Sequence, residues 1–214
     1  MGVMSETEIA RALLDIGAVG FMPDEPITFK SGLLSPVYID NRQLIYWPQQ
    51  WHTTIQGLRD RAAALQFDVI AGIETAGIPH SSALAYELRV PSVFVRKQAK
   101  EHGTRSRVEG GDVSGKRVLL IEDLVTTGGS SLAGVAGLRT TGAEVHDCLC
   151  ITTYGFAMSV RAFNAAKVRL HALVPFDTII QTAYERGYFG ADVMAAIQDW
   201  RKNPHDWTAR HGLT

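Results

Sequence analysis

The chain has little cysteine and almost no net charge, and each scarcity excludes classes of protein. Cys148 and Cys150 are its two cysteines, and on a strand such an i, i+2 pair shares one face. We interpret them as small core residues of a protein in a reducing compartment. The formal net charge of −1 supplies no global field that would draw the chain to nucleic acid or a membrane. Any anionic ligand must therefore be held by a local group of cations and backbone amides.

Long apolar runs are also lacking. No apolar stretch approaches the length of a membrane span, and the first residues lack a cationic segment followed by an apolar core. We therefore expect a cytoplasmic protein with no membrane partner. Hydrophobic residues make up 46% and charged residues 20% of the 214 residues, which is typical of a globular chain. That length suffices for one ordinary domain that folds without disulfides or a structural metal.

The first 65 residues contain clear helix signals. Ser5-x-x-Glu8 is a capping-box pattern, and apolar residues follow it at helical spacing, which predicts a helix that ends near Gly17. Residues 27–45 are predicted to be extended, with a turn at Ser31-Gly32. Pro48 suits a first helical turn, so we expect a helix from there to about residue 65.

From residue 68 onward, apolar runs alternate with helical segments. Strands are predicted at residues 68–73, 91–96, 117–122, 144–152 and 168–174, with helices at about 80–88 and 130–140 and one more in the tail at about 190–202. This alternation predicts an α/β fold, a parallel sheet with right-handed crossovers and helices on both faces. Residues 97–115 are polar and rich in glycine, and they are too many for an idle connection.

The segment from Val118 to Ser131 carries the chemistry. A buried strand is expected to end at the adjacent acids Glu122 and Asp123, and Thr126-Thr127-Gly128-Gly129-Ser130 then opens a helix. Glycines let backbone N–H groups turn inward, hydroxyls add donors, and the helix N-terminus adds positive potential. Together they form a cradle for a phosphate at the carboxyl edge of the sheet.

The two acids narrow the choice of ligand. Carboxylates repel a phosphate, so they should face another part of the same molecule, and ribose hydroxyls near a 5′-phosphate are natural partners. A sugar phosphate fits this pattern. The alternative is a capped strand-to-helix turn whose acids face solvent.

A second glycine pattern is set aside. Gly110-x-x-x-x-Gly115-Lys116 resembles a Walker A loop, but Arg117 stands where Ser or Thr is needed. The pattern also precedes a strand instead of leaving one for a helix. We interpret it as an ordinary turn.

The strand, the acidic pair and the Thr-Thr-Gly-Gly-Ser segment resemble the phosphoribosyl diphosphate (PRPP) motif of the type I phosphoribosyltransferases. Three further segments resemble the orotate-specific members of that family. These are Phe29-Lys30-Ser31-Gly32 with Ser35-Pro36, the run from Arg96 to Gly103, and Trp200-Arg201-Lys202-Asn203-Pro204. The similarity extends from about residue 8 to residue 204.

The resemblance implies a type I phosphoribosyltransferase fold in one domain over residues 1–214. An N-terminal helix and hood occupy residues 1–47, and the PRPP-binding core occupies residues 68–175. It implies transfer of the 5-phosphoribosyl group of PRPP to orotate, giving orotidine 5′-monophosphate and diphosphate in pyrimidine biosynthesis. It also implies Mg²⁺ carried by PRPP without a protein metal site, and a homodimer in which the 97–115 loop reaches the partner's site.

The resemblance also implies roles for individual residues. Arg96, Lys100, His102 and Asp123 are expected to be catalytic, and Lys30 and Thr126 to contact orotate. The expected PRPP contacts are Thr75, Ala76, Arg96, Lys97, Lys100, His102, Glu122, Asp123, Leu124, Val125, Thr126, Thr127, Gly128, Gly129 and Ser130. The loop cations would stabilise charge that develops on departing diphosphate, and loop closure would exclude water.

Two positions depart from the family pattern. Ala76 stands where some members carry a lysine, and Tyr154 stands where some carry an arginine that pairs with orotate. Backbone amides and Lys30 are therefore the candidates for holding the orotate carboxylate.

Two other functions compete with the orotate enzyme. A phosphoribosyltransferase for another base, such as a purine, would share residues 118–131 but would not explain both the 28–36 segment and the 96–103 loop. A PRPP-sensing regulator that binds nucleic acid should show an extended basic face or an added domain, which this composition does not suggest.

Overall fold

The computed structural model describes residues 4–29, 31–97 and 107–210. Five parallel strands form the centre of the molecule: β5 (Val69–Ile73), β6 (Ser92–Val95), β8 (Arg117–Val125), β9 (Glu144–Thr153) and β10 (Arg169–Pro175). They lie in the order β10-β9-β8-β5-β6, and the short β7 (Val108–Glu109) adds an antiparallel edge to β6. The predicted α/β fold with a parallel sheet is confirmed.

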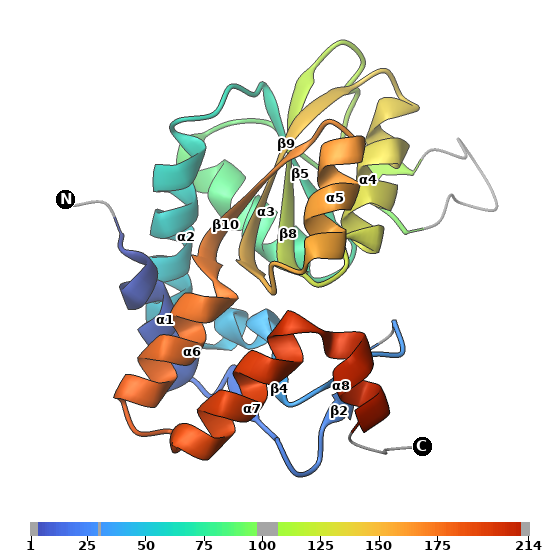
Figure 1. Ribbon diagram of the computed structural model, residues 1–214. Coiled ribbons are helices and arrows are strands. Elements are labelled where there is room, and N and C mark those ends of the chain that lie inside the picture. Colours follow the sequence, from blue (N-terminus) through green and yellow to red (C-terminus); the bar gives the residue numbers. More distant parts are fainter. Residues whose placement is uncertain (1–3, 30, 98–106, 211–214) are drawn as a thin grey trace.

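Helices cover both faces of the sheet (Figure 1). Helices α4 (Gly129–Arg139) and α5 (Ala157–Ala165) lie on one face, and α1 (Glu6–Asp15), α2 (Pro48–Ala62) and α3 (Gly77–Leu88) lie on the other. Side chains of the central strands alternate between two buried clusters. Leu119 and Ile121 belong to the cluster on the α1–α3 face, whereas Val118 and Leu120 belong to the cluster on the α4–α5 face. Burial on both faces explains why these strands are continuous apolar runs.

Local signals in the sequence start the first helices as predicted. The Ser5 hydroxyl accepts a hydrogen bond from the Glu8 N–H at 3.2 Å, and the Glu8 carboxylate accepts one from the Ser5 N–H at 2.8 Å. This reciprocal capping box fixes the start of α1, which ends at Asp15. Pro48 is the first residue of α2, which ends at Ala62, three residues before the predicted limit.

Several boundaries differ from the predictions. Strand β8 continues through Glu122 and Asp123 to Val125, because Leu124 and Val125 still pair with β9. Helix α3 begins at Gly77, earlier than expected. Residues 41–45, predicted as extended, lie in the 3-10 helix η1 (Asn41–Tyr46). The tail holds three helices where one was predicted: α6 (Phe176–Glu185), α7 (Ala191–Lys202) and α8 (Pro204–Arg210).

Short strands from the N-terminal region form a hood beyond the sheet. Strands β1 (Val19–Phe21) and β4 (Val37–Ile39) pair antiparallel, as do β2 (Ile27–Thr28) and β3 (Leu34–Ser35). The C-terminal α7 and α8 pack beside them (Figure 1). The fully buried Trp200 of α7 donates its indole N–H to the Leu34 carbonyl at 2.7 Å. The end of the chain thus anchors the N-terminal hairpin.

Both cysteines are free and buried within the α4–α5 face of the core, as predicted. No helix within the described residues is long and apolar enough to cross a membrane.

Two glycines allow close packing around the turn between β5 and α3. A Cβ added to Gly77 would lie 2.6 Å from the carbonyl oxygen of Ile121, and one added to Gly72 would lie 2.2 Å from the Ser81 hydroxyl. The Ile121 carbonyl oxygen is a backbone atom and cannot move aside cheaply at such a distance. Gly77 therefore sets the spacing between the Thr75-Ala76 turn and the acidic end of β8, and Gly72 lets α3 lie close to β5.

Gly77→Ala should lower the free energy of unfolding by about 2 kcal/mol, because the new methyl group overlaps the β8 backbone. For a chain of this size that corresponds to a fall in melting temperature of about 4–8 °C. Gly129→Ala is the matched control, since the nearest atom to its added Cβ is 4.0 Å away. Equal melting temperatures for the two variants would contradict the close approach.

Candidate active site

The adjacent carboxyl groups of Glu122 and Asp123 form the centre of the site at the carboxyl end of β8. Glu122 is only 5% exposed, and its carboxylate accepts hydrogen bonds from the Ser131 hydroxyl at 3.3 Å and from the Asp123 N–H at 3.2 Å. Burial, reinforced by the neighbouring Asp123, raises the pKa of Glu122 well above its usual value. A proton or a polar ligand therefore has to offset the buried charge.

Asp123 has a different environment. Burial raises the pKa of Asp123, while its hydrogen bond with Glu122, a backbone N–H and the positive charge of Arg42 act in the opposite direction. The Asn41 side-chain amide donates to the Asp123 carbonyl at 2.7 Å. This contact joins η1 of the hood to the acidic segment, although 82 residues separate the two in the sequence.

The turn after β8 leads directly into α4. Gly128 has φ of +87°, which is a left-handed conformation, and a Cβ there would lie 2.9 Å from the Phe163 ring. Only glycine suits this position. The first N–H groups of α4 have no hydrogen-bond partner within the helix, because the residues that precede them lie outside it. The turn and helix start thus have the donors and the positive potential of a phosphate cradle.

A pocket of about 240 Å³ joins this turn to the hood. Hood residues line one part of it, and the end of β8, the turn and the start of α4 line the rest. The lining residues are Phe29, Ser31, Tyr38, Ile39, Leu124, Val125, Thr126, Thr127, Gly128, Gly129, Ser130 and Ser131. Sequence reasoning identified the turn, but it missed Tyr38 and Ile39, which carry no motif of their own.

Cationic residues lie on the other side of the α4 start. A second pocket, of about 310 Å³, is lined by Arg96, Lys97 and Arg107 together with Gly129 and Ser130. Arg96 forms an ion pair with Glu109 at 3.0 Å, and its carbonyl accepts a hydrogen bond from the Arg107 side chain at 2.9 Å. Arg107 was missed by the sequence analysis, although its place in the polar 97–115 segment could have indicated it.

The turn before α3 also meets this cationic segment. The Lys97 N–H donates to the Glu74 carboxylate at 3.0 Å, and Thr75 and Ala76 follow Glu74 directly. The structure therefore brings the predicted diphosphate turn next to the base of the predicted loop. Lys30, Lys100 and His102 lie outside the described residues.

Tyr154 is a structural residue of the hood contact. Its fully buried ring stacks on Phe156 with centroids 5.6 Å apart, and its hydroxyl donates to the Val37 carbonyl at 3.3 Å. Burial raises the pKa of Tyr154, so it stays neutral. A neutral, hydrogen-bonded phenol cannot supply the positive charge of an arginine.

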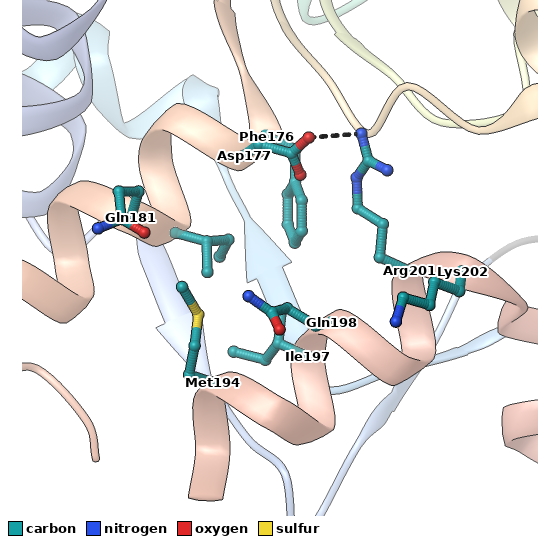
Figure 2. A pocket seen from close by; sticks show the side chains of 9 residues that line it. Phe176, Asp177, Gln181, Met194, Ile197, Gln198, Arg201 and Lys202 are labelled. Atoms are coloured by element: carbon teal, nitrogen blue, oxygen red, sulfur yellow. Dashed lines mark hydrogen bonds and ion pairs between the residues drawn. The ribbon is translucent and has the colours of Figure 1, made fainter. Parts of the chain in front are cut away.

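A further pocket, of about 370 Å³, lies between α6 and α7 and is shown in Figure 2. Arg201 crosses it to form an ion pair with Asp177 at 2.8 Å, and Phe176 and Met194 supply apolar walls. None of its lining residues belongs to the acidic pair or to the glycine turn. The 240 Å³ pocket, which is lined by the glycine turn and begins directly after the acidic pair at Leu124, is therefore the candidate active site.

The turn at Gly110–Lys116 behaves as an ordinary connection. The Gly115 N–H donates to the Gly142 carbonyl at 2.9 Å, and the segment enters β8 from its amino end. It lies at the opposite end of the strand from the acidic pair.

Comparison with known proteins agrees with this geometry. A profile of the phosphoribosyl transferase domain family matches residues 52–178. The orotate phosphoribosyltransferase of Coxiella burnetii is 39% identical over 203 residues, covering 94% of this chain and 97% of that protein. The enzyme of the same name from Bacillus caldolyticus is 40% identical over 202 residues, covering 94% and 98%.

Solved structures show the same fold. Leishmania donovani UMP synthase superposes with a TM-score of 0.80 at 27% identity, covering 92% of this chain and 42% of that one. Orotate phosphoribosyltransferase from Aeropyrum pernix gives a TM-score of 0.72 at 28% identity, covering 85% and 99%.

The parallel sheet ends in two carboxylates beside a glycine turn, and the family profile matches residues 52–178 of the chain. Together these findings identify a phosphoribosyltransferase. With its close relatives matched over nearly their whole length, the chain belongs to the orotate phosphoribosyltransferases. The resemblance seen in the sequence is confirmed.

Glu122→Gln should stabilise the protein at neutral pH. The raised pKa of Glu122 means that the folded state binds more protons than the unfolded state above the ordinary carboxyl value of 4.5, so ionisation of Glu122 lowers stability as the pH rises from there. A neutral amide removes that cost, and we expect a gain of about 1 kcal/mol at pH 7 that shrinks toward pH 4.5.

Urea unfolding between pH 4.5 and 8 measures this effect. The exposed Glu144 gives the control variant Glu144→Gln, which should leave stability unchanged. A Glu122→Gln protein that is less stable than the parent at pH 7 would show that the buried carboxylate is satisfied by its surroundings.

Proposed function

We propose that the protein transfers the 5-phosphoribosyl group of PRPP to orotate, giving orotidine 5′-monophosphate and diphosphate. The observation that carries this proposal is the placement of Glu122 and Asp123 directly before a glycine turn that lines the 240 Å³ pocket. A ligand with hydroxyls next to a phosphate complements that arrangement. Orotate is proposed as the acceptor because the relatives are named orotate phosphoribosyltransferases.

The donor is proposed to bind along the end of β8. Backbone and hydroxyl groups from Thr126 to Ser130 hold the 5′-phosphate, and the two carboxylates accept hydrogen bonds from the ribose hydroxyls. Such hydrogen bonds stabilise the charged carboxylates that burial disfavours. Burial makes the charged carboxylates unfavourable, and hydrogen bonds from the ribose hydroxyls offset that cost when the donor binds.

Diphosphate is proposed to leave toward the cationic side of the site. Backbone N–H groups of Thr75 and Ala76 and the side chains of Arg96 and Lys97 are the described candidates, with Lys100 and His102 from the loop. Positive groups fixed there stabilise charge that grows on the leaving group, and so favour the transition state over the ground state. Arg96 would exchange its ion pair with Glu109 for this contact.

Magnesium is the proposed metal ion of the reaction. Among the described residues no group of three or more His, Cys, Asp or Glu side chains lies close enough to hold a metal. Mg²⁺ keeps several waters and binds through substrate phosphates, so PRPP is proposed to carry the ion and no protein metal site is needed. When bound, the ion would offset negative charge on the diphosphate of the donor.

Orotate is proposed to bind at the hood end of the pocket, with Lys30 and Thr126 beside it. We further propose that the whole chain acts as one domain, with the hood of residues 1–47 over the core of residues 68–175. The free, buried cysteines accord with a cytoplasmic enzyme.

A test of the acceptor follows from the ultraviolet absorbance of the base. Purified protein is mixed with PRPP, Mg²⁺ and, separately, orotate, uracil, adenine or hypoxanthine. We expect turnover with orotate that exceeds turnover with each other base by at least about 100-fold, since recognition of a carboxylate by a charged partner is worth about 3 kcal/mol. Faster turnover of a purine would refute the proposed acceptor.

The loop is proposed to act across a homodimer. Lys100→Ala should lower kcat by about 100-fold or more with little change in melting temperature, because it removes a contact that is proposed to form only on the leaving group. Asp123→Asn should inactivate the donor site of its own subunit.

Mixing these two inactive variants distinguishes the arrangements. If the loop serves the partner's site, each mixed dimer has one intact site, and an equimolar mixture recovers up to about a quarter of the parent activity. If the loop serves its own subunit, every site keeps one defect and the mixture stays inactive.

A further inference from the structure

The hood end of the active-site pocket lacks a described cation. Phe29, Ser31, Tyr38 and Ile39 line it there, and no lining residue of this pocket within the described chain is basic. An aromatic acid bound at this end brings a carboxylate out of water, which is costly without a positive partner. A cation just behind the lining residues would meet that need.

Arg42 lies in this position. It follows β4 by three residues, and its terminal N–H donates to the hydroxyl of the pocket-lining Tyr38 at 2.9 Å. Its Nε donates to the Asp40 carboxylate at 2.5 Å. The guanidinium group is therefore oriented from two sides, and one of its two partners is a residue that lines the pocket.

The backbone under Arg42 is also fixed. The preceding residue, Asn41, is fully buried and donates to the Asp123 carbonyl. The charge of Arg42 is felt at the acidic pair, where it opposes the rise in the pKa of Asp123 caused by burial. Arg42 thus belongs electrostatically to the active site, although it stands 81 positions before Asp123 in the sequence.

Arg42 has donors left for a ligand. A guanidinium group carries five N–H groups, and two of them bond to Asp40 and Tyr38 within the described chain. The side chain is 59% exposed, so it is not sealed in by neighbours. A solvent-exposed pair with Asp40 alone would contribute little to stability, and it would not require the second contact with Tyr38.

We propose that Arg42 binds the carboxylate of the acceptor, and that Tyr38 and Asp40 are positioning residues that present its guanidinium group to the pocket. A planar guanidinium matches a carboxylate with two parallel hydrogen bonds, which gives specificity as well as affinity. The inference deepens the proposed function and rests on it, since it takes the acceptor to be orotate.

Arg42→Gln tests the inference by steady-state kinetics with each substrate varied in turn. Loss of a charge-assisted hydrogen bond is worth about 1.5–3 kcal/mol, so the KM for orotate should rise by about 10–100-fold. The KM for PRPP should rise by a clearly smaller factor, because Arg42 is proposed to contact the acceptor and acts on the donor site only through its charge at Asp123. Arg61→Gln is the matched control, since Arg61 is similarly exposed and pairs with Glu6 far from the pocket.

Tyr38→Phe provides a second, milder variant. It keeps the ring that lines the pocket and removes the hydroxyl that holds Arg42, so the KM for orotate should rise by a smaller factor, about 3–10-fold. Melting temperatures of all three variants should match the parent, because Arg42 and the Tyr38 hydroxyl are not part of the core.

The outcomes separate the two claims. A parent protein that does not use orotate refutes the proposed function itself. An active parent whose Arg42→Gln variant has an orotate KM like that of Arg61→Gln refutes the role of Arg42. An equal rise in the KM of both substrates also refutes it, because Arg42 would then act on the shape of the whole site.

Discussion

The buried carboxylate of Glu122 is the constraint on which the active site depends. Burial and the adjacent Asp123 disfavour its charge, and its hydrogen bonds within the described chain are with the Ser131 hydroxyl, the Asp123 N–H and the Asp123 carboxyl group. A fold selected only for stability would not place two carboxyl groups there. The unfavourable charge is understandable if a ligand supplies the missing hydrogen bonds, so the site trades stability for recognition of a polyol phosphate.

The rest of the molecule holds that carboxylate pair in place from three directions. Gly77 allows the β5–α3 turn to come close beside β8, Gly128 turns the chain into α4, and Asn41 ties the hood to Asp123. The hood in turn depends on the C-terminal helices, because Trp200 bonds to the Leu34 carbonyl and packs among aromatic rings. The first and last parts of the chain therefore shape one pocket with the sheet.

The sequence predicted those features of the fold and the site that local patterns encode. The apolar runs gave the strands, Ser5-x-x-Glu8 gave the start of α1, and the acidic pair with the glycine turn gave the phosphate site. The end of β8 was misplaced because an acidic pair usually stops a strand, whereas Leu124 and Val125 continue to pair with Thr152 and Thr153. Helix α6 was missed because no side chain caps its start. The start of α8 could have been predicted from Pro204. Tyr38, Asn41 and Arg42 were missed because only tertiary packing brings them to Asp123.

The account's central claim is that the end of β8 binds the donor through both its sugar and its phosphate. A crystal structure with PRPP and Mg²⁺ tests it most directly. The account predicts the 5′-phosphate against the backbone of Thr126–Ser130 and the ribose hydroxyls within hydrogen-bond distance of Glu122 and Asp123. Donor bound elsewhere, or bound with its ribose turned away from both carboxylates, would contradict it.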